Sequence, residues 1–165
     1  MKVITLNVNG IRAATRKGFF KWLRAQKPDI VCLQEIRIQE TQLTEEMREA
    51  CGMHSYYHCA EKPGYSGVAI YTKIPPVNVQ TGLGWRDFDS EGRMLQIDFK
   101  ELSVISLYVP SGSAKESRQN FKYKCMKRIK KYMFEMDNQN KNFIFCGDFN
   151  IAHTKLDLKN WRGNQ

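Results

Sequence analysis

The sequence lacks the features that define several whole classes of protein. No apolar run approaches the roughly 18 to 20 residues that cross a bilayer. The opening residues, MKVITLNVNG, have neither the long apolar core nor the small-residue cleavage site of a signal peptide. The five cysteines form no CxxC pair, which argues against a zinc site, and we expect reduced, buried thiols in a cytosolic protein. We therefore expect neither a membrane protein, nor a secreted disulfide scaffold, nor a disordered tail.

The composition is that of a globular chain with an excess of positive charge. The 165 residues suffice for one ordinary domain, and 42% of them are hydrophobic. The formal net charge is +9, with 26 Lys and Arg against 17 Asp and Glu. Such a surplus either keeps the protein soluble or favours a polyanionic partner such as nucleic acid.

Apolar periodicity predicts alternating strands and helices. The predicted strands are 2–7, 29–34, 54–60, 67–73, 77–81, 93–99, 102–109 and 142–148, and the predicted helices are 16–25, 42–51 and 114–137. The longest helix should bury Phe121, Cys125, Ile129, Met133 and Met136. Because the strands from 54 to 109 have no helix between them, they predict an antiparallel meander. The flanking strand–helix units predict a layered α/β fold with outer helices.

Polar side chains follow the apolar strands where each strand ends. They are Asn7, Glu35, Tyr108, Asp148 and Asn150. Each alone is typical of a turn or a solvated strand end. Together they predict a shared rim, because adjacent strand ends converge where ligands commonly bind.

The residue types on this rim suit phosphodiester hydrolysis. Mg²⁺ prefers hard oxygen ligands and retains several waters, so Glu35 and Asp148 suit a metal whose coordination a substrate phosphate completes. Asp148 can orient or deprotonate a water, Asn150 can hold Asp148 or the phosphate, and Tyr108 can donate to a phosphoryl oxygen. His54 and His58 lie in a predicted strand, so their spacing is a weak metal signal.

Six motifs carry a family resemblance that runs from Lys2 to about Trp161. They are LNVNGIRAA (6–14), PDIVCLQEIR (28–37), YSGVAIYTK (65–73), GRMLQIDF (92–99), LYVPSG (107–112) and GDFNIAH (147–153). The chain resembles the exonuclease III family of abasic-site endonucleases, within the endonuclease/exonuclease/phosphatase superfamily. LQE and GDFN occur across that superfamily, whereas NVNGIRAA, GFFKWL and YVPSG favour its DNA-repair branch.

The resemblance implies a fold, an activity and a partner. The fold would be α/β (α+β), a DNase I-like layered β-sandwich flanked by helices. The activity would be Mg²⁺-dependent cleavage of duplex DNA 5′ to abasic sites, with 3′-to-5′ exonuclease and 3′-repair activities, and Mn²⁺ as a substitute metal. The location would be cytoplasmic, at a bacterial-type nucleoid.

The resemblance also implies residue roles. Glu35 would be the principal Mg²⁺ ligand, with Asn7 and Asp148 beside the metal. Tyr108 and Asn7 would contact phosphate, and Asp148 and Asn150 would orient the attacking water. Asn9 and Arg37, next to the site, would contact DNA. Ser111 and Gly112 depart from the Asn or Gln that relatives place after YVP, which weakens the phosphate contact expected at Ser111.

The resemblance further implies that residues 1–165 form the N-terminal portion of a single domain. Relatives continue past GDFN with a further Asp, an Asp-His pair and an apolar pocket, none of which follows Asn150 here. We expect about one half of a two-sheet sandwich. Its exposed inner face, costing about 25 cal/mol per Å², would need a complementary second half or a second copy. We expect this chain alone to be inactive or nearly so.

Positive residues supply the DNA-contact candidates. Eight Lys or Arg lie between Lys115 and Lys131, against one acid, and this pattern fits a solvated helix face or phosphate contact. Lys115 and Arg118, close to Tyr108, and Arg12, after the first strand, are the favoured contacts. In the segment 85–93, Trp85 and Phe88 could either insert near a duplex or anchor the loop.

Other functions remain open from the sequence. A nonspecific or retrotransposon-type endonuclease would cut intact and abasic duplexes alike. A non-catalytic nucleic-acid-binding fragment would bind duplex equally with or without Mg²⁺ and after Glu35→Gln. A lipid or inositol phosphatase is disfavoured by the NVNGIRAA opening.

Overall fold

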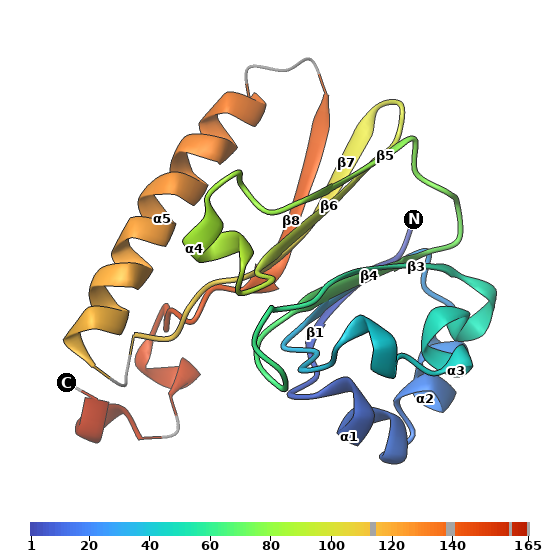
Figure 1. Cartoon of the computed structure of the whole chain (residues 1–165), viewed down its shortest axis with the longest axis horizontal. Helices are drawn as coiled ribbons and strands as arrows, with labels where there is room; N and C mark the ends of the chain where they lie inside the picture. The colour runs from blue at the N-terminus through green and yellow to red at the C-terminus, as the bar shows by residue number, and fades with distance from the viewer. Residues whose placement is uncertain (113–114, 138–140, 159, 165) are drawn as a thin grey trace.

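The computed structural model describes residues 1–112, 115–137, 141–158 and 160–164. Their strands form two four-stranded sheets (Figure 1). The first sheet has the order β1-β2-β4-β3, and the second has the order β5-β6-β7-β8. The strand bounds are β1 Val3–Asn7, β2 Ile30–Gln34, β3 His54–His58, β4 Val68–Thr72, β5 Asn78–Thr81, β6 Met94–Asp98, β7 Leu102–Tyr108 and β8 Asn142–Asp148.

The strand directions bring the polar strand ends toward one another. β1 and β2 are parallel, with Asn7 opposite Gln34, and β7 and β8 are parallel, with Tyr108 opposite Asp148. The other neighbours are antiparallel, as the predicted meander requires. The meander is nevertheless divided, because the chain leaves the first sheet after β4 and enters the second sheet at β5.

The apolar core between the sheets explains why this division occurs. Ile30, Cys32, Val68 and Ile70 of the first sheet pack with Leu95, Ile97, Val104 and Cys146 of the second, and all eight are buried. The expectation that the chain supplies one sheet with an exposed inner face is therefore wrong. Each inner face is covered by the other sheet of the same chain, which removes both apolar surfaces from water.

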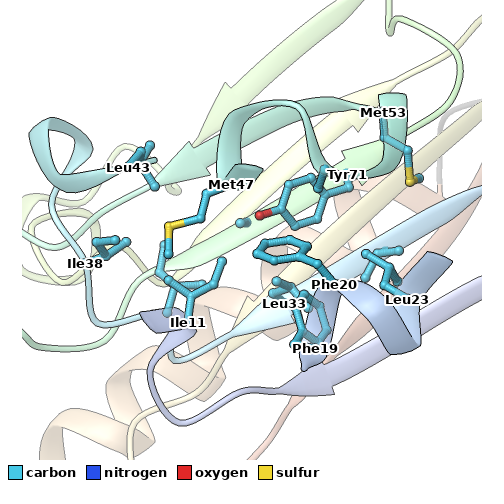
Figure 2. Close-up of a cluster of buried hydrophobic side chains, with 14 residues drawn as sticks. Ile11, Phe19, Phe20, Leu23, Leu33, Ile38, Leu43, Met47, Met53 and Tyr71 are labelled. Atoms are coloured by element: carbon cyan, nitrogen blue, oxygen red, sulfur yellow. The ribbon is translucent and has the colours of Figure 1, made fainter. Parts of the chain in front are cut away.

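Helices cover the outer faces. α1 (Ile11–Arg16), α2 (Phe19–Gln26) and α3 (Glu45–Arg48) lie on the first sheet, and α4 (Arg86–Asp89) and α5 (Glu116–Asp137) lie on the second (Figure 1). Figure 2 shows Phe20 and Leu23 of α2 packed near Leu33 and Tyr71. The helix predicted over 16–25 is divided, because Arg16 ends α1 and Gly18, with a φ of 87°, is the N-cap of α2. Only 45–48 of the predicted 42–51 helix is α-helical.

The long helix α5 matches its predicted apolar face with one exception. Cys125, Ile129 and Met136 are buried, whereas Met133 is 39% exposed. Each step of four residues turns about 40° beyond a full circle. Met133, two such steps from Cys125, has therefore rotated away from the sheet, while Met136 has returned toward it. Residue 114, the predicted helix start, lies outside the described residues.

The burial of the cysteines and the character of the helices can be compared with what the sequence predicted. Cys32, Cys125 and Cys146 are buried as predicted, whereas Cys51 and Cys59 are half-buried. No helix in the described part of the chain is long and apolar enough to cross a membrane.

Candidate active site

Asn7 lies at the centre of the candidate site. Its Nδ2 donates to Glu35 Oε2 at 2.9 Å and to Asp148 Oδ2 at 2.8 Å. The amide is oriented by its other end, because Oδ1 accepts the Asn9 backbone N–H at 2.9 Å. Glu35 follows a strand of the first sheet, and Asp148 ends a strand of the second. One neutral amide thus holds together two carboxylates that come from different sheets.

Several site residues have a backbone conformation that side chains disfavour. Of the seven non-glycine residues with positive φ in the described chain, four are candidate site residues: Asn9, Glu35, Arg37 and Asn150. Such residues cost about 1 to 3 kcal/mol each and cluster at functional sites. Main-chain bonds hold Glu35 and Arg37 in place, from Gly10 N to Glu35 O at 2.8 Å and from Arg37 N to Ser66 O at 2.8 Å.

Arg37 forms an ion pair with Glu35 at the edge of the site. The Arg37 guanidinium contacts Glu35 Oε1, and the two side chains are 45% and 15% exposed. Glu35 therefore presents one oxygen to Asn7 and the other to Arg37. The pair places a positive charge beside the carboxylates, where an anionic ligand would meet it.

Tyr108 ends β7 directly opposite Asp148. Burial and the negative charge of Glu35 raise the pKa of Tyr108 to about 12, although the nearby Arg93 guanidinium opposes this shift. The phenol consequently keeps its proton at neutral pH. It can donate a hydrogen bond to an oxygen bound beside Glu35 and Asp148.

Asn150 is tied into the same end of the sandwich. Its backbone N–H donates to Asp148 Oδ1 at 2.9 Å, and its Nδ2 donates to Val109 O at 2.7 Å. Lys122 Nζ donates to Asn150 O at 2.5 Å.

Two hollows lie beside Asp148. Ser111, Asp148 and Asn150 line a hollow of about 550 Å³, and Asn7 and Asp148 line a second one of about 360 Å³. Asp148 therefore faces open space large enough for a substrate group.

The donor set suits Mg²⁺ rather than a metal that needs a full protein cage. Within the described ranges, no group of three or more His, Cys, Asp or Glu side chains could hold a metal ion. Glu35 and Asp148 converge on a single donor, Nδ2 of Asn7. Mg²⁺ is commonly held by one or two carboxylates plus waters and phosphate oxygens. These residues fit such an ion.

Comparison with known proteins identifies the family of the chain. A model of the endonuclease/exonuclease/phosphatase family matches residues 4–165. The chain belongs to this family. The resemblance to exonuclease III-type enzymes is borne out by relatives: an exodeoxyribonuclease of Bacillus subtilis is 37% identical and the DNA repair nuclease APEX1 of Danio rerio is 36% identical, each over the whole chain. The chain spans 64% and 54% of these relatives, respectively.

Solved structures of the family share the fold. An AP endonuclease from Archaeoglobus fulgidus superimposes with a TM-score of 0.82 at 28% identity, covering 94% of this chain and 60% of that one. A Neisseria 3′ phosphatase, NExo, solved with a product DNA hairpin, gives 0.78 at 24% identity and covers the same shares. The predicted layered α/β sandwich is confirmed.

The predicted DNA contacts differ in their exposure and in their partners. Lys115 is exposed just before α5, and Arg12 is exposed on α1. Arg118 is 29% exposed and pairs with Glu91 through Nη1 at 2.7 Å. All three stay predictions. Phe88 is fully buried and stacks on Trp85, which Arg128 covers at 4.5 Å, so this pair anchors α4 to α5.

Sequence reasoning missed two buried charged residues next to the candidate site. Arg93, beside Tyr108, is 2% exposed, and Lys122, beneath Asn150, is 9% exposed. Arg93 stands at the start of the predicted strand 93–99, and Lys122 belongs to the basic helix face, so neither position predicts a buried charge. His58 bonds the Met94 carbonyl through Nδ1 at 2.8 Å, which accounts for it without a metal.

Proposed function

We propose that this site catalyses Mg²⁺-dependent phosphodiester cleavage in DNA, 5′ to abasic sites, with 3′-to-5′ exonuclease activity. The observation that carries the proposal is the convergence of Glu35 and Asp148 on Asn7. Two carboxylates held by one amide, beside a protonated phenol, match what in-line attack on a phosphate requires. The relatives named above, an exodeoxyribonuclease and a DNA repair nuclease, support the same reaction class.

The side chains divide the work by their chemistry. Glu35 would hold the metal, which supplies charge neutralisation at the phosphoryl oxygens when it is bound. Asp148 would accept a proton from the attacking water, and Asn150 would hold Asp148 in line through its backbone N–H. Tyr108 would donate to a non-bridging oxygen, stabilising the charge that develops there.

Positive charge would hold the DNA backbone outside this centre. Arg37, Lys115 and Arg12 are exposed and could contact phosphates, whereas Ser111 lines the hollow beside Asp148. Contacts of this kind position the duplex without reading its sequence. We therefore propose that recognition depends on backbone shape, with duplex DNA containing abasic sites or 3′ ends as the partner.

Metal binding tests the centre independently of turnover. Mn²⁺, titrated into the chain and followed by electron paramagnetic resonance, should bind at least about tenfold more weakly after Glu35→Gln or Asp148→Asn, a loss of about 1.4 kcal/mol. Asp87→Asn is the matched control, because Asp87 is exposed on α4. Unchanged Mn²⁺ affinity in both site variants would refute the proposed centre.

Nicking assays then distinguish the reaction classes. A duplex with one abasic site and the same duplex without it are incubated with Mg²⁺ and an excess of the chain, so that the residual cleavage of a nearly inactive chain is measured, with the Bacillus subtilis relative as the positive control. Cleavage confined to the abasic duplex supports the repair activity, and equal cleavage of both supports a nonspecific endonuclease. Duplex binding that ignores both Mg²⁺ and Glu35→Gln would instead indicate a binding fragment. Full turnover by the 165-residue chain would contradict the expectation that it is inactive alone.

A further inference from the structure

Arg93 is among the largest fully buried side chains in the described chain, at 2% exposure. It directly precedes β6 and lies beside the end of β7. A guanidinium removed from water costs several kcal/mol unless its N–H groups find partners. The partners it has found therefore indicate what it does.

The guanidinium is surrounded by acceptors. Nε donates to Glu91 Oε2 at 2.5 Å, Nη1 donates to the Tyr108 carbonyl at 2.9 Å, and Nη2 donates to the Tyr65 hydroxyl at 3.0 Å. Glu91 is shared, because Arg118 donates to its Oε1 at 2.7 Å. Arg93 is thus held from one side by Glu91 and Tyr65, and it holds Tyr108 on the other.

Arg93 contacts both the backbone and the ring of Tyr108. The Tyr108 N–H donates to the Arg93 carbonyl at 2.8 Å, so both backbone polar groups of Tyr108 bond to this one residue. The guanidinium carbon also lies 4.9 Å from the centre of the Tyr108 ring, within the range of a cation–π contact. The two backbone bonds hold the main chain of Tyr108 in place, and the cation–π contact restrains the direction of its ring.

The turn that carries Arg93 has little freedom to shift. Gly92 has a φ of 58°, and a Cβ there would lie 2.5 Å from the His58 carbonyl oxygen and 2.7 Å from Ala60 N. The backbone before β6 therefore packs directly on the segment that follows β3. Arg93 is anchored by main-chain packing as well as by Glu91.

We propose that Arg93 is the positioning residue for Tyr108, holding its hydroxyl toward the carboxylates. The inference rests on the proposed function, in which Tyr108 contacts the phosphate. At 2% exposure, Arg93 cannot itself reach a substrate. It acts through Tyr108, and its loss would leave the phenol present but free to rotate away.

Fluorine NMR tests the inference without metal or DNA. The seven tyrosines are replaced by 3-fluorotyrosine, and the Tyr108 line is assigned by its loss in Tyr108→Phe. Arg93→Lys keeps the charge but loses the forked geometry. We expect it to shift the Tyr108 line or to broaden it at least about twofold, as the released ring exchanges among conformers. Arg128→Lys is the control, because Arg128 also stacks on an aromatic ring, that of Trp85.

A second variant covers the case in which Arg93→Lys does not fold. Tyr65→Phe removes one acceptor of Arg93 at a half-buried position and should shift the Tyr108 line in the same sense, by less. A Tyr108 line that is unmoved in folded Arg93→Lys, or in Tyr65→Phe if the first variant is unfolded, overturns the inference. Because this signal needs no Mn²⁺, failure of the metal titration would contradict the proposed function and leave this result to be judged separately.

Discussion

Replacing Asn7 by alanine should destabilise the protein in a way that Mg²⁺ reverses. The Asn7 amide donates to Glu35 and to Asp148, and without it the two carboxylates face each other unbridged. Two unit charges about 6 Å apart repel by about 3 kcal/mol at an effective dielectric constant near 20. Solvent at the rim and the Arg37 ion pair reduce this repulsion, while the lost hydrogen bonds to charged acceptors add to the cost.

We therefore expect Asn7→Ala to lower the free energy of unfolding by about 2 to 3 kcal/mol, or the melting temperature by about 4 to 12 °C. Calorimetry in EDTA and in excess Mg²⁺ measures the effect. A divalent cation between the carboxylates replaces the missing donor, so Mg²⁺ should stabilise Asn7→Ala more than the wild type. Adding Glu35→Gln should restore stability in EDTA, because it removes one of the two charges.

Asn78→Ala provides the matched control for this experiment. Asn78 Nδ2 donates to Asp98 Oδ2 at 2.9 Å, a similar amide–carboxylate bond far from the rim and with a single carboxylate. We expect a loss of about 1 kcal/mol and no response to Mg²⁺. An Asn7→Ala protein that melts with the wild type in EDTA, or that responds to Mg²⁺ no more than Asn78→Ala does, would refute the paired-carboxylate reasoning.

Two further predictions concern stability. Gly92→Ala should lower the free energy of unfolding by at least about 2 kcal/mol in a denaturant titration, because strain at its φ of 58° adds to the clash with His58 O. Gly84→Ala is the control and should cost about 1 kcal/mol, because Gly84 has a φ of 71° and nothing lies within 4 Å of the added Cβ. Equal losses of stability in the two variants would disprove the close packing at Gly92. Burial alone would raise the pKa of Asp98, but hydrogen bonds from Ser103, Asn78 and Gln96 hold it below its ordinary value of 3.8. The stability that this depressed pKa provides is complete above pH 3.8 and is lost as the pH falls through the folded-state pKa, so Asp98→Asn should flatten the acid limb of a stability–pH curve, and an unchanged limb would contradict this reading.

The strands could be predicted from the sequence, but their division into sheets could not. Apolar runs mark β2, β4, β6 and β7 because these strands are buried on both faces. The same runs carry no information about which strand lies beside which. The crossing between Thr72 and Asn78 places Ile70 in the same buried cluster as Leu95 and Val104 of the other sheet. That packing exists only in the folded chain, so the sequence pattern by itself predicts a single continuous meander.

Some residues of the candidate site could likewise be predicted from the sequence, and others could not. Asn7, Tyr108 and Asp148 were accessible to prediction, because each ends an apolar strand and the rule that strand ends converge needs no tertiary detail. Arg93 was not, because it lies where the segment 85–93 meets the predicted strand 93–99, and no local pattern there predicts that a guanidinium is buried. Its burial requires Tyr65 and Tyr108, which come from distant parts of the chain.

The backbone of Glu35 shows why local propensity cannot produce this site. Glutamate has no intrinsic preference for a φ of 59°, and a left-handed residue costs about 1 to 2 kcal/mol. In an extended conformation, Glu35 would continue β2. The bond from Gly10 N to its carbonyl and that from Arg37 N to Ser66 O hold the turn instead, and the turned Glu35 carboxylate meets Nδ2 of Asn7. The strain thus lies at the residue whose direction decides whether the two sheets share one candidate site, and contacts distant in sequence maintain it.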